Sequence, residues 1–360
     1  MNSTIRIDFH CYNHHAMDMG MSMAKIVDAA HRYDTVIIDT MWEPFDIRQI
    51  EWKGTKVLQI LQSVCEDNGW PLEKFHWISY NPVQPKDSWP SMEVSVYTQP
   101  FTTAADKRFV ANKVIKKHFG IYINNSSWPR LWLSSHLFDQ HADKTDQTFV
   151  RSPVNAGHMA NLDLDALLFN FTAEGHINQI NLDRVQHLIQ HLPLTNSTIN
   201  LHAEVDQHFD TRFDLEHTLS PLANDIMHRY NSVFVDVVCE TMFTGQCVSF
   251  DEKIARNLIS KTPFVIMGAK HCLRYLRAMG FKTFGDFWDE SYDHCSGANR
   301  CVEIARLLDT IASKSVTELT RMYDQMSTVL EHNHSRYLAL CGMPNLSQYM
   351  IRTMNGVASV

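Results

Sequence analysis

Glu252 and Lys253 place a carboxylate beside an ammonium at the start of a predicted helix. The helix is flanked by two apolar segments that predict strands, VFVDVV (residues 233 to 238) and FVIMG (264 to 268). In a strand-helix-strand unit, anions bind beyond the carboxyl ends of the strands, close to the free amides of the helix. The pattern therefore predicts a phosphate site that contains Lys253.

The same residues have a purely structural interpretation. Ser249 is predicted to begin the helix, which runs to about Ser260, and Ser249 with Glu252 fits a capping box. Glu252 and Arg256 have the spacing of an ordinary helical ion pair, which contributes only about 0.3 to 0.5 kcal/mol. In this interpretation Lys253 is a solvated helix lysine.

Three short segments resemble a known motif. Residues 240 to 241, 249 to 253 and 263 to 268 look like the donor-binding motif of fucosyltransferase-like glycosyltransferases with the GT-B fold, in which Thr-Glu-Lys follows a strand. Asp251 stands where Thr is usual. Residues 273 to 293 are similar to a tail found in uncharacterised proteins of bacteriophages and other viruses.

A second segment extends the resemblance. FGIYINN (residues 119 to 125) predicts a strand that ends in polar residues, and Arg130 follows five residues later. A similar strand in the fucosyltransferases ends in Ser-Asn, and a nearby Arg faces the donor phosphates. The resemblance implies that Arg130 binds phosphate and that Asn124 or Asn125 lines the cleft. The local alternative is an Arg on a surface helix.

The resemblance implies a nucleotide-diphosphate sugar as donor substrate, with no further cofactor and no metal. Cleavage of the sugar-phosphate bond puts charge on the leaving diphosphate, which Lys, Arg and helix amides can stabilise. A single base implies inversion at the anomeric carbon. The residues that we expect at the donor are Glu252, Lys253, Arg130, Asn125, Ser249, Glu240 and Arg256.

The acceptor hydroxyl needs a base, and the resemblance implies an acidic residue in a loop of the N-terminal domain. Glu43 lies between Trp42 and Phe45 after a predicted strand, and apolar neighbours would raise the pKa of its carboxyl. The alternative for Glu43 is a solvated loop carboxylate. His14, in a loop that also contains His10 and His15, is the second candidate.

Alternating strand and helix patterns predict an α/β protein that is GT-B-like, with two Rossmann-like domains facing a central cleft. We expect an N-terminal acceptor domain at 1 to 112, a donor domain at 113 to 340 and a C-terminal tail at 341 to 360 that packs back on the N-terminal domain. The predicted elements include strands at 4 to 9, 35 to 39 and 75 to 80, and helices at 55 to 67, 164 to 171, 183 to 191 and 316 to 340. Residues 106 to 118 are predicted to form a polar linking helix or hinge.

Composition limits the possible classes. A chain of 360 residues is too long for a single compact core, which predicts two domains. The hydrophobic content of 44% is that of a globular protein. The polar start and the absence of a long apolar run predict a soluble cytoplasmic protein, in an infected host cell if phage-encoded, without a membrane partner. Eight cysteines without a Cys-x-x-Cys pair predict reduced thiols. The chain lacks the glycine-rich, P-loop and His-Glu-x-x-His motifs of dehydrogenases, kinases and zinc peptidases.

The acceptor has several candidates. The viral resemblance favours the hydroxymethyl group of a modified pyrimidine, 5-hydroxymethylcytosine, in phage DNA, although the net charge of −8 does not favour general DNA binding. Two basic clusters could follow phosphates or be solvated helix faces; they are Lys107, Arg108, Lys113, Lys116 and Lys117, and Lys270, Arg274, Arg277 and Lys282. A fucosyltransferase-like enzyme acting on glycans, or a non-catalytic virion or DNA-associated protein, are the alternatives. Asp163-Leu-Asp165 is interpreted as a pair of carboxylates at the N-terminus of a helix and not as the Asp-x-Asp motif of metal-dependent glycosyltransferases.

Overall fold

The computed structural model of the chain has a mixed α/β fold with parallel sheets, which confirms the predicted class. It describes residues 3 to 9, 16 to 40, 47 to 52, 54 to 95, 112 to 123, 126 to 149, 159 to 176, 180 to 194, 226 to 240, 242 to 243, 248 and 250 to 358. The chain divides into two compact units. Unit 1 comprises Met1–Tyr97, Thr244–Ser249 and Asn345–Val360, and unit 2 comprises Thr98–Phe243 and Phe250–Pro344.

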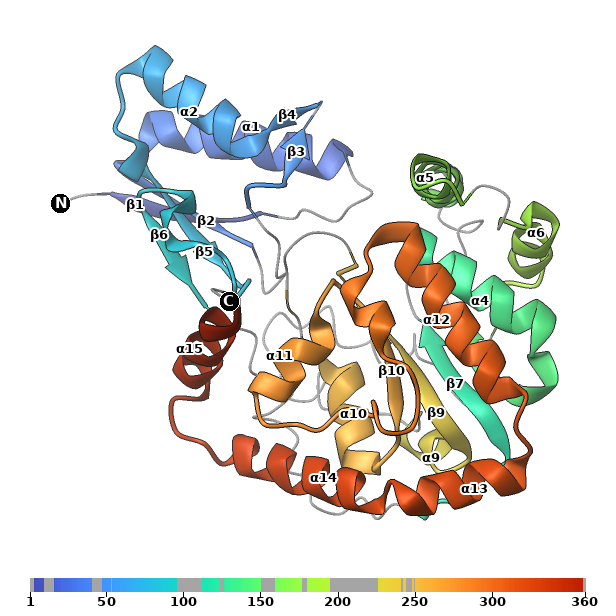
Figure 1. Cartoon of the computed structure of the whole chain (residues 1–360). Helices are drawn as coiled ribbons and strands as arrows, with labels where there is room; N and C mark the ends of the chain where they lie inside the picture. Colours follow the sequence, from blue (N-terminus) through green and yellow to red (C-terminus); the bar gives the residue numbers. More distant parts are fainter. Residues whose placement is uncertain are drawn as a thin grey trace. The chain divides into compact units, whose positions relative to one another are not determined.

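Unit 1 is built on a parallel sheet with the strand order β1-β2-β5-β6 (Figure 1). Its strands are β1 (Thr4–Asp8), β2 (Thr35–Asp39), β5 (Phe75–Ser79) and β6 (Met92–Val94), with a small hairpin of β3 (Glu51–Trp52) and β4 (Thr55–Lys56). Its helices are α1 (Ala16–Arg32), α2 (Val57–Asn68) and α15 (Leu346–Ala358). Helix α1 contacts β1 and β2. Val36, Ile38, Phe75 and Trp77 are fully buried, as the period of two in the strand sequences requires.

Unit 2 is built on a second parallel sheet with the strand order β10-β9-β7-β8 (Figure 1). Its strands are β7 (Lys117–Ile123), β8 (Thr145–Phe149), β9 (Val233–Cys239) and β10 (Phe264–Met267). Its helices are α4 (Trp128–Gln140), α5 (Met159–Ala173), α6 (Leu182–Gln190), α9 (Ile226–Tyr230), α10 (Glu252–Ser260), α11 (Cys272–Ala278), α12 (Gly297–Ala312), α13 (Val316–Gln325) and α14 (Ser327–Cys341).

The strand order of unit 2 creates a topological switch point. From β7 the chain passes through α4 to β8 on one side, whereas β9 lies on the other side of β7 and leads through α10 to β10. Because such crossovers are right-handed, α4 and α10 cover opposite faces of the sheet. The carboxyl ends of β7 and β9 are therefore the position where ligands of open α/β sheets bind.

Two groups of helices cover this sheet. Helices α4, α5, α6 and α12 contact one another, and α10 contacts α9, α14 and β9. All seven residues of β9 are buried, as expected of a central strand covered on both faces. Within the described residues, no helix combines the length and apolar content that would let it cross a bilayer.

A buried ion pair joins three elements of unit 2. Arg300 on α12 is fully buried and lies 3.4 Å from the carboxylate of Asp293, and it also donates to the carbonyl of Ile266 on β10 (3.3 Å). The same carboxylate accepts hydrogen bonds from the backbone N–H groups of Leu273 and Arg274 in the first turn of α11 (3.1 and 3.3 Å). Arg300 and Asp293 therefore hold α11, α12 and β10 together.

The helix predicted at 106 to 118 is wrong for its described part, residues 112 to 118. The backbone N–H groups of Val114 and Lys116 donate to the carbonyls of Asn231 and Ser232, both at 2.8 Å, and β7 begins at Lys117. These long-range bonds favour an extended chain over helical bonds. Residues 96 to 111 lie outside the described part, so the domain boundary near 112 stays a prediction.

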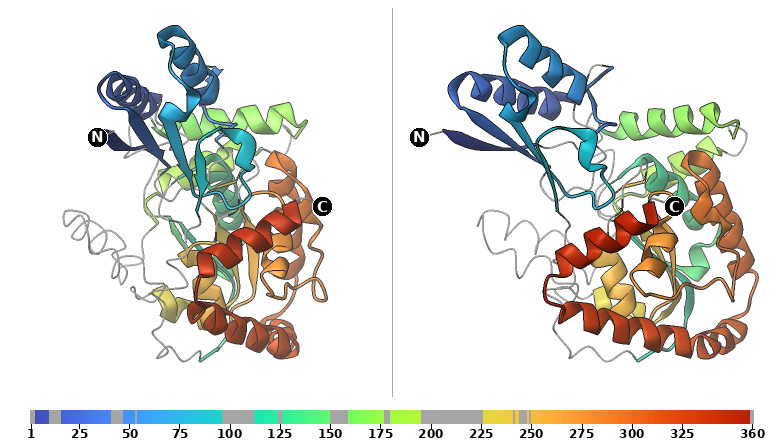
Figure 2. Two further views of the ribbon diagram at one scale, coloured as in Figure 1. Left: turned by 90° about the vertical axis from the view of Figure 1, so that its left-hand side faces the viewer. Right: turned by 60° about the vertical axis from the view of Figure 1, so that its left-hand side comes forward.

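The single helix predicted at 316 to 340 is two helices, α13 and α14, which follow each other along unit 2 (Figure 2). The interruption is at Met326, whose N–H donates to the carbonyls of Met322 and Tyr323 and whose side chain is fully buried. No Gly or Pro marks this position. Both helices belong to unit 2, and the following helix, α15, belongs to unit 1.

Candidate functional site

Asp251 forms the N-cap of α10. Its backbone is extended, and its carboxylate accepts a hydrogen bond from the N–H of Lys253 at 2.9 Å. The predicted capping box is therefore wrong, because the N-cap is Asp251 and not Ser249, and Glu252 is the first residue of the helix and not the third. An Asp at this position satisfies a free amide and places a negative charge at the positive end of the helix dipole.

The ammonium of Lys253 lies between two carboxylates. Its Nζ forms an ion pair with Asp251 and lies 3.1 Å from Oε1 of Glu252. The side chain is 20% exposed, so Lys253 is not the solvated helix lysine of the structural interpretation. Burial lowers the pKa of Lys253, but the carboxyl groups of Asp251, Glu252 and Glu240 outweigh burial, and the pKa lies well above its usual value. Lys253 is therefore charged.

Glu252 is the second carboxylate of the site, and its side chain is 25% exposed. Burial alone would raise the pKa of Glu252, but the positive charges of Lys253 and Arg256 outweigh burial and lower it. Arg256 also hydrogen-bonds to the phenol of Tyr230. Arg256 therefore lies one turn further along α10, close to Glu252 and directed toward α9.

Arg130 approaches the same position from α4. It occupies the first turn of that helix, which begins after Ser127 with Pro129 in its first turn, a favoured place for proline. Arg130 is 7% exposed, and its guanidinium donates to the carbonyls of Cys239 (3.0 Å) and Glu240 (2.9 Å), where β9 ends. Arg130 is thus not on a surface, and its charge acts on that of Lys253.

Glu240 directly follows β9 and is 4% exposed. Within the described part of the chain, neither oxygen of its carboxyl accepts a hydrogen bond from a donor group. The carboxyl lies within hydrogen-bond reach of the carboxyl of Asp251. Burial, and then the charge of Asp251, raise the pKa of Glu240 well above its usual range.

These residues meet at the switch point of unit 2. Arg130 comes from the first turn after β7, and Glu240, Asp251, Glu252 and Lys253 come from the connection between β9 and α10. The N-termini of α4 and α10 contribute free amides and positive dipole ends. The arrangement can bind an anion, provided that the anion competes with Asp251 and Glu252 for the ammonium.

Four predicted residues cannot be placed. Glu43, His14, Asn125 and Ser249, together with Asn124, lie outside the described residues. Five others are described, and the structure brings them together at the switch point or beside it; they are Arg130, Glu240, Glu252, Lys253 and Arg256.

A buried polar network next to the site was not predicted. Asp236, in the middle of β9, is 2% exposed and accepts a hydrogen bond from the amide of Asn257 at 2.7 Å. Lys113 donates to the carbonyl of Tyr230 (2.6 Å) and to the hydroxyl of Thr262 (2.9 Å). Burial raises the pKa of Asp236 to about 7 and lowers the pKa of Lys113 to about 7. The signal in the sequence was an Asp in the centre of the apolar segment VFVDVV.

His136, His141 and Asp309 form a second cluster, and their ligand atoms lie within 4.8 Å of one another. Nε2 of His136 and Nε2 of His141 lie 2.8 and 2.7 Å from one oxygen of Asp309. Nδ1 of His136 lies 3.1 Å from a guanidinium nitrogen of Arg184. Because Arg only donates, this nitrogen accepts, and the ring proton is on Nε2. That proton occupies the position a metal would need, so the geometry favours a hydrogen-bonded link between α4, α6 and α12.

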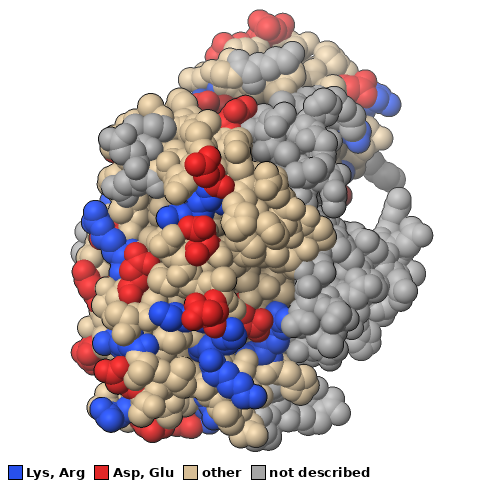
Figure 3. Space-filling view, turned by 90° about the vertical axis from the view of Figure 1, so that its right-hand side faces the viewer, with Lys and Arg blue, Asp and Glu red and all other residues tan. Residues whose placement is uncertain are grey.

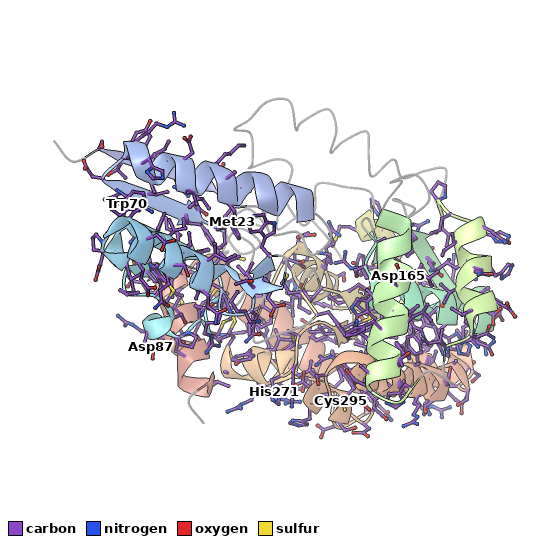
Figure 4. The ribbon with its side chains drawn as sticks, turned by 90° about the horizontal axis from the view of Figure 1, so that it is seen from above. Met23, Trp70, Asp87, Asp165, His271 and Cys295 are labelled. Carbon is purple, nitrogen blue, oxygen red and sulfur yellow. The ribbon has the colours of Figure 1, made fainter. Side chains whose placement is uncertain are left out.

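Two described members of the basic clusters have partners within unit 2, whereas Lys116, Lys270 and Lys282 are exposed. Lys113 has the buried contacts given above, and Arg277 pairs with Glu290 at 2.6 Å. On the face shown in Figure 3, basic and acidic side chains are interspersed. Asp165 is exposed within α5, where Figure 4 labels it. Asp163 and Asp165 lie in a helix, as predicted, but the prediction that they lie at its N-terminus is wrong, because α5 begins at Met159.

Comparisons of the chain with protein-family models, with curated proteins and with solved structures found no match. An assignment of the site therefore depends on the geometry of its residues and on the resemblance of its motif.

Proposed function

We propose that this chain is a glycosyltransferase with a GT-B-like arrangement, in which unit 2 binds a nucleotide-diphosphate sugar and unit 1 binds a hydroxyl acceptor. The observation that carries the proposal is the convergence of Arg130, Lys253 and the N-termini of α4 and α10 at one switch point. Two cations and two helix dipoles at this position match the charge of a diphosphate. The fucosyltransferase-like motif supports the same substrate.

In this proposal Lys253 leaves Asp251 to bind the diphosphate and stabilises the charge that develops when the sugar-phosphate bond breaks. Glu252 accepts hydrogen bonds from ribose hydroxyls, as carboxylates do in dinucleotide sites. Arg256 stays near Glu252 and keeps it ionised. Arg130 is held by backbone carbonyls and contributes its charge from the opposite side of the switch point.

The base and the acceptor belong to unit 1. Glu43, with His14 as the second candidate, would take the proton of the acceptor hydroxyl in an inverting displacement. The hydroxymethyl group of 5-hydroxymethylcytosine in DNA is the first acceptor to test, and it is supported by the viral resemblance. Lys113 and Arg277 are engaged within unit 2, so these two members of the basic clusters do not support a DNA acceptor. A glycan hydroxyl is the alternative acceptor.

The test is a search for a sugar adduct by mass spectrometry. The protein is incubated with UDP-, GDP- and ADP-sugars and with either hydroxymethylated DNA or a glycan panel, with and without a metal chelator. Transfer to one acceptor that is lost in Lys253→Met supports the proposal. Diphosphate release without an adduct supports donor hydrolysis only.

A non-catalytic nucleotide-binding protein is the second candidate. The observation that favours it is that Asp251 and Glu252 already neutralise Lys253. The same incubation separates the two functions. Binding of a nucleotide sugar with no adduct on any acceptor would favour the binding protein, and absence of both binding and transfer would reject the donor site altogether.

A further inference from the structure

Glu240 is a buried acid for which the proposed donor chemistry has no role. Both of its oxygens lack a hydrogen-bond donor within the described residues, and the side chain is 4% exposed. It packs over the end of β10, where a Cβ added to Gly268 would lie 3.1 Å from its Cβ and Cγ. An ionised carboxylate in such surroundings carries a large desolvation cost that no donor offsets.

The charged and titratable groups around Glu240 come from four elements. Asp251, Glu252 and Lys253 belong to the start of α10, and Arg130 belongs to α4. The remaining two are buried thiols, Cys239 at the end of β9 and Cys272 at the start of α11. The ammonium of Lys253 is committed to Asp251 and Glu252, and Arg130 donates to the backbone carbonyls of Cys239 and Glu240. Glu240 and Asp251, two adjacent acids, are left to share a proton.

We propose that Glu240 acts in the donor site as a neutral carboxylic acid that donates its proton in a hydrogen bond to Asp251. The inference rests on the proposed donor function and gives Glu240 a positioning role. When Lys253 moves to the diphosphate, Asp251 loses its counter-ion inside the protein. The hydrogen bond from Glu240 then stabilises the carboxylate of Asp251 in place of the ammonium. This lowers the free-energy cost of moving the ammonium of Lys253 to the ligand.

This role predicts a distinct behaviour for two variants. Glu240→Gln retains a neutral hydrogen-bond donor, so we expect its affinity for a nucleotide diphosphate at pH 7 to stay within about 3-fold of the wild type. Glu240→Ala removes the donor and leaves Asp251 unsatisfied, so affinity should fall by roughly 10- to 100-fold. Wild-type affinity should also fall at alkaline pH as Glu240 ionises, whereas Glu240→Gln should show no such loss.

The protonation state is tested first, without ligand. Isotope-edited infrared spectroscopy of the full chain with labelled Glu should show a neutral carboxylic acid at pH 7 that disappears in Glu240→Gln. Glu290→Gln is the matched control. The side chain of Glu290 is only 8% exposed, but it accepts hydrogen bonds from Arg277, Thr283 and the N–H of Phe284, so its replacement should leave the band unchanged. Absence of the band in the wild type overturns the inference.

Binding is tested second, by titration of UDP and GDP between pH 6 and pH 10. A pH-dependent loss in the wild type that is absent in Glu240→Gln supports the positioning role. Identical pH profiles of the two proteins overturn that role and leave the donor site intact. If neither nucleotide binds the wild type, the proposed function and the positioning role both fail, and the infrared band still decides whether Glu240 holds a proton.

Discussion

Replacement of Lys253 by Met removes the ammonium that lies at the N-terminus of α10, while it preserves most of the side-chain volume. A charge-assisted hydrogen bond to a phosphate contributes about 1.5 to 3 kcal/mol. Loss of one such contact corresponds to a decrease of about 10- to 150-fold in affinity for a nucleotide diphosphate or in turnover. Removal of the ammonium also leaves Asp251 and Glu252 without their shared counter-ion.

The structural cost of Lys253→Met has to be separated from the binding loss. We expect a decrease of roughly 1 to 3 kcal/mol in the free energy of unfolding, because Lys253 and Glu252 retain 20% and 25% exposure and the pair is only partly buried. Denaturant unfolding measures this decrease. Nucleotide binding is then measured by calorimetry well below the melting temperature, where the variant is fully folded.

Lys261→Met is the matched control for the same chemical change. Lys261 lies at the other end of α10 and pairs with Glu331, whose side chain is 61% exposed. Exposed pairs contribute at most about 1 kcal/mol, so this variant should bind and turn over donor like the wild type. Equal nucleotide affinity and equal turnover in Lys253→Met and the wild type would refute the assignment of Lys253 to the phosphates.

Three further predictions concern stability, pH and metal. Arg300→Ala should lower the free energy of unfolding by about 3 to 5 kcal/mol, because it leaves Asp293 buried without its partner, whereas exposed Arg306→Ala should change it by less than about 1 kcal/mol; urea titration compares them. Protonated Asp236 contributes to the free energy of unfolding; this contribution is fully present below pH 3.8 and is lost as the pH rises through about 7. The free energy of unfolding of Asp236→Asn, relative to that of the wild type, should therefore increase over that range by up to about 4 kcal/mol. Unfolding experiments at several pH values measure this difference. Zinc should not raise the melting temperature, and a zinc-dependent increase that disappears in His136→Gln would contradict the proton position inferred from Arg184.

Most of the strands could be predicted from the sequence, because each has a strong local pattern of apolar and β-branched residues. β2 spans the predicted residues 35 to 39, and β9 and β10 coincide with VFVDVV and FVIMG apart from a residue at one end. The α2, α5 and α6 helices also lie where apolar periodicity placed them. Errors arose where distant contacts decide the structure. Val114 and Lys116 pair with residues 231 and 232, which no local pattern indicates.

The residue types of the candidate site could be predicted from the sequence, but not which of these residues contact one another. The charge of Lys253 and its place in the first turn of α10 follow from the sequence. That its counter-ions are Asp251 and Glu252 depends on which residue caps the helix, and Asp251 and Ser249 are both good N-caps. The meeting of Arg130 with Glu240 depends on strand order, since β7 and β9 are neighbours although more than a hundred residues separate them.

Arg130 donates to two main-chain carbonyl oxygens, and this type of partner determines which substitutions the contact tolerates. Every amino acid at positions 239 and 240 presents the same carbonyl, so substitution of either side chain leaves the guanidinium with its anchor. A loss of nucleotide affinity in Glu240→Ala can therefore be attributed to the missing carboxyl group and not to displacement of Arg130, because the carbonyl of residue 240 still accepts from the guanidinium.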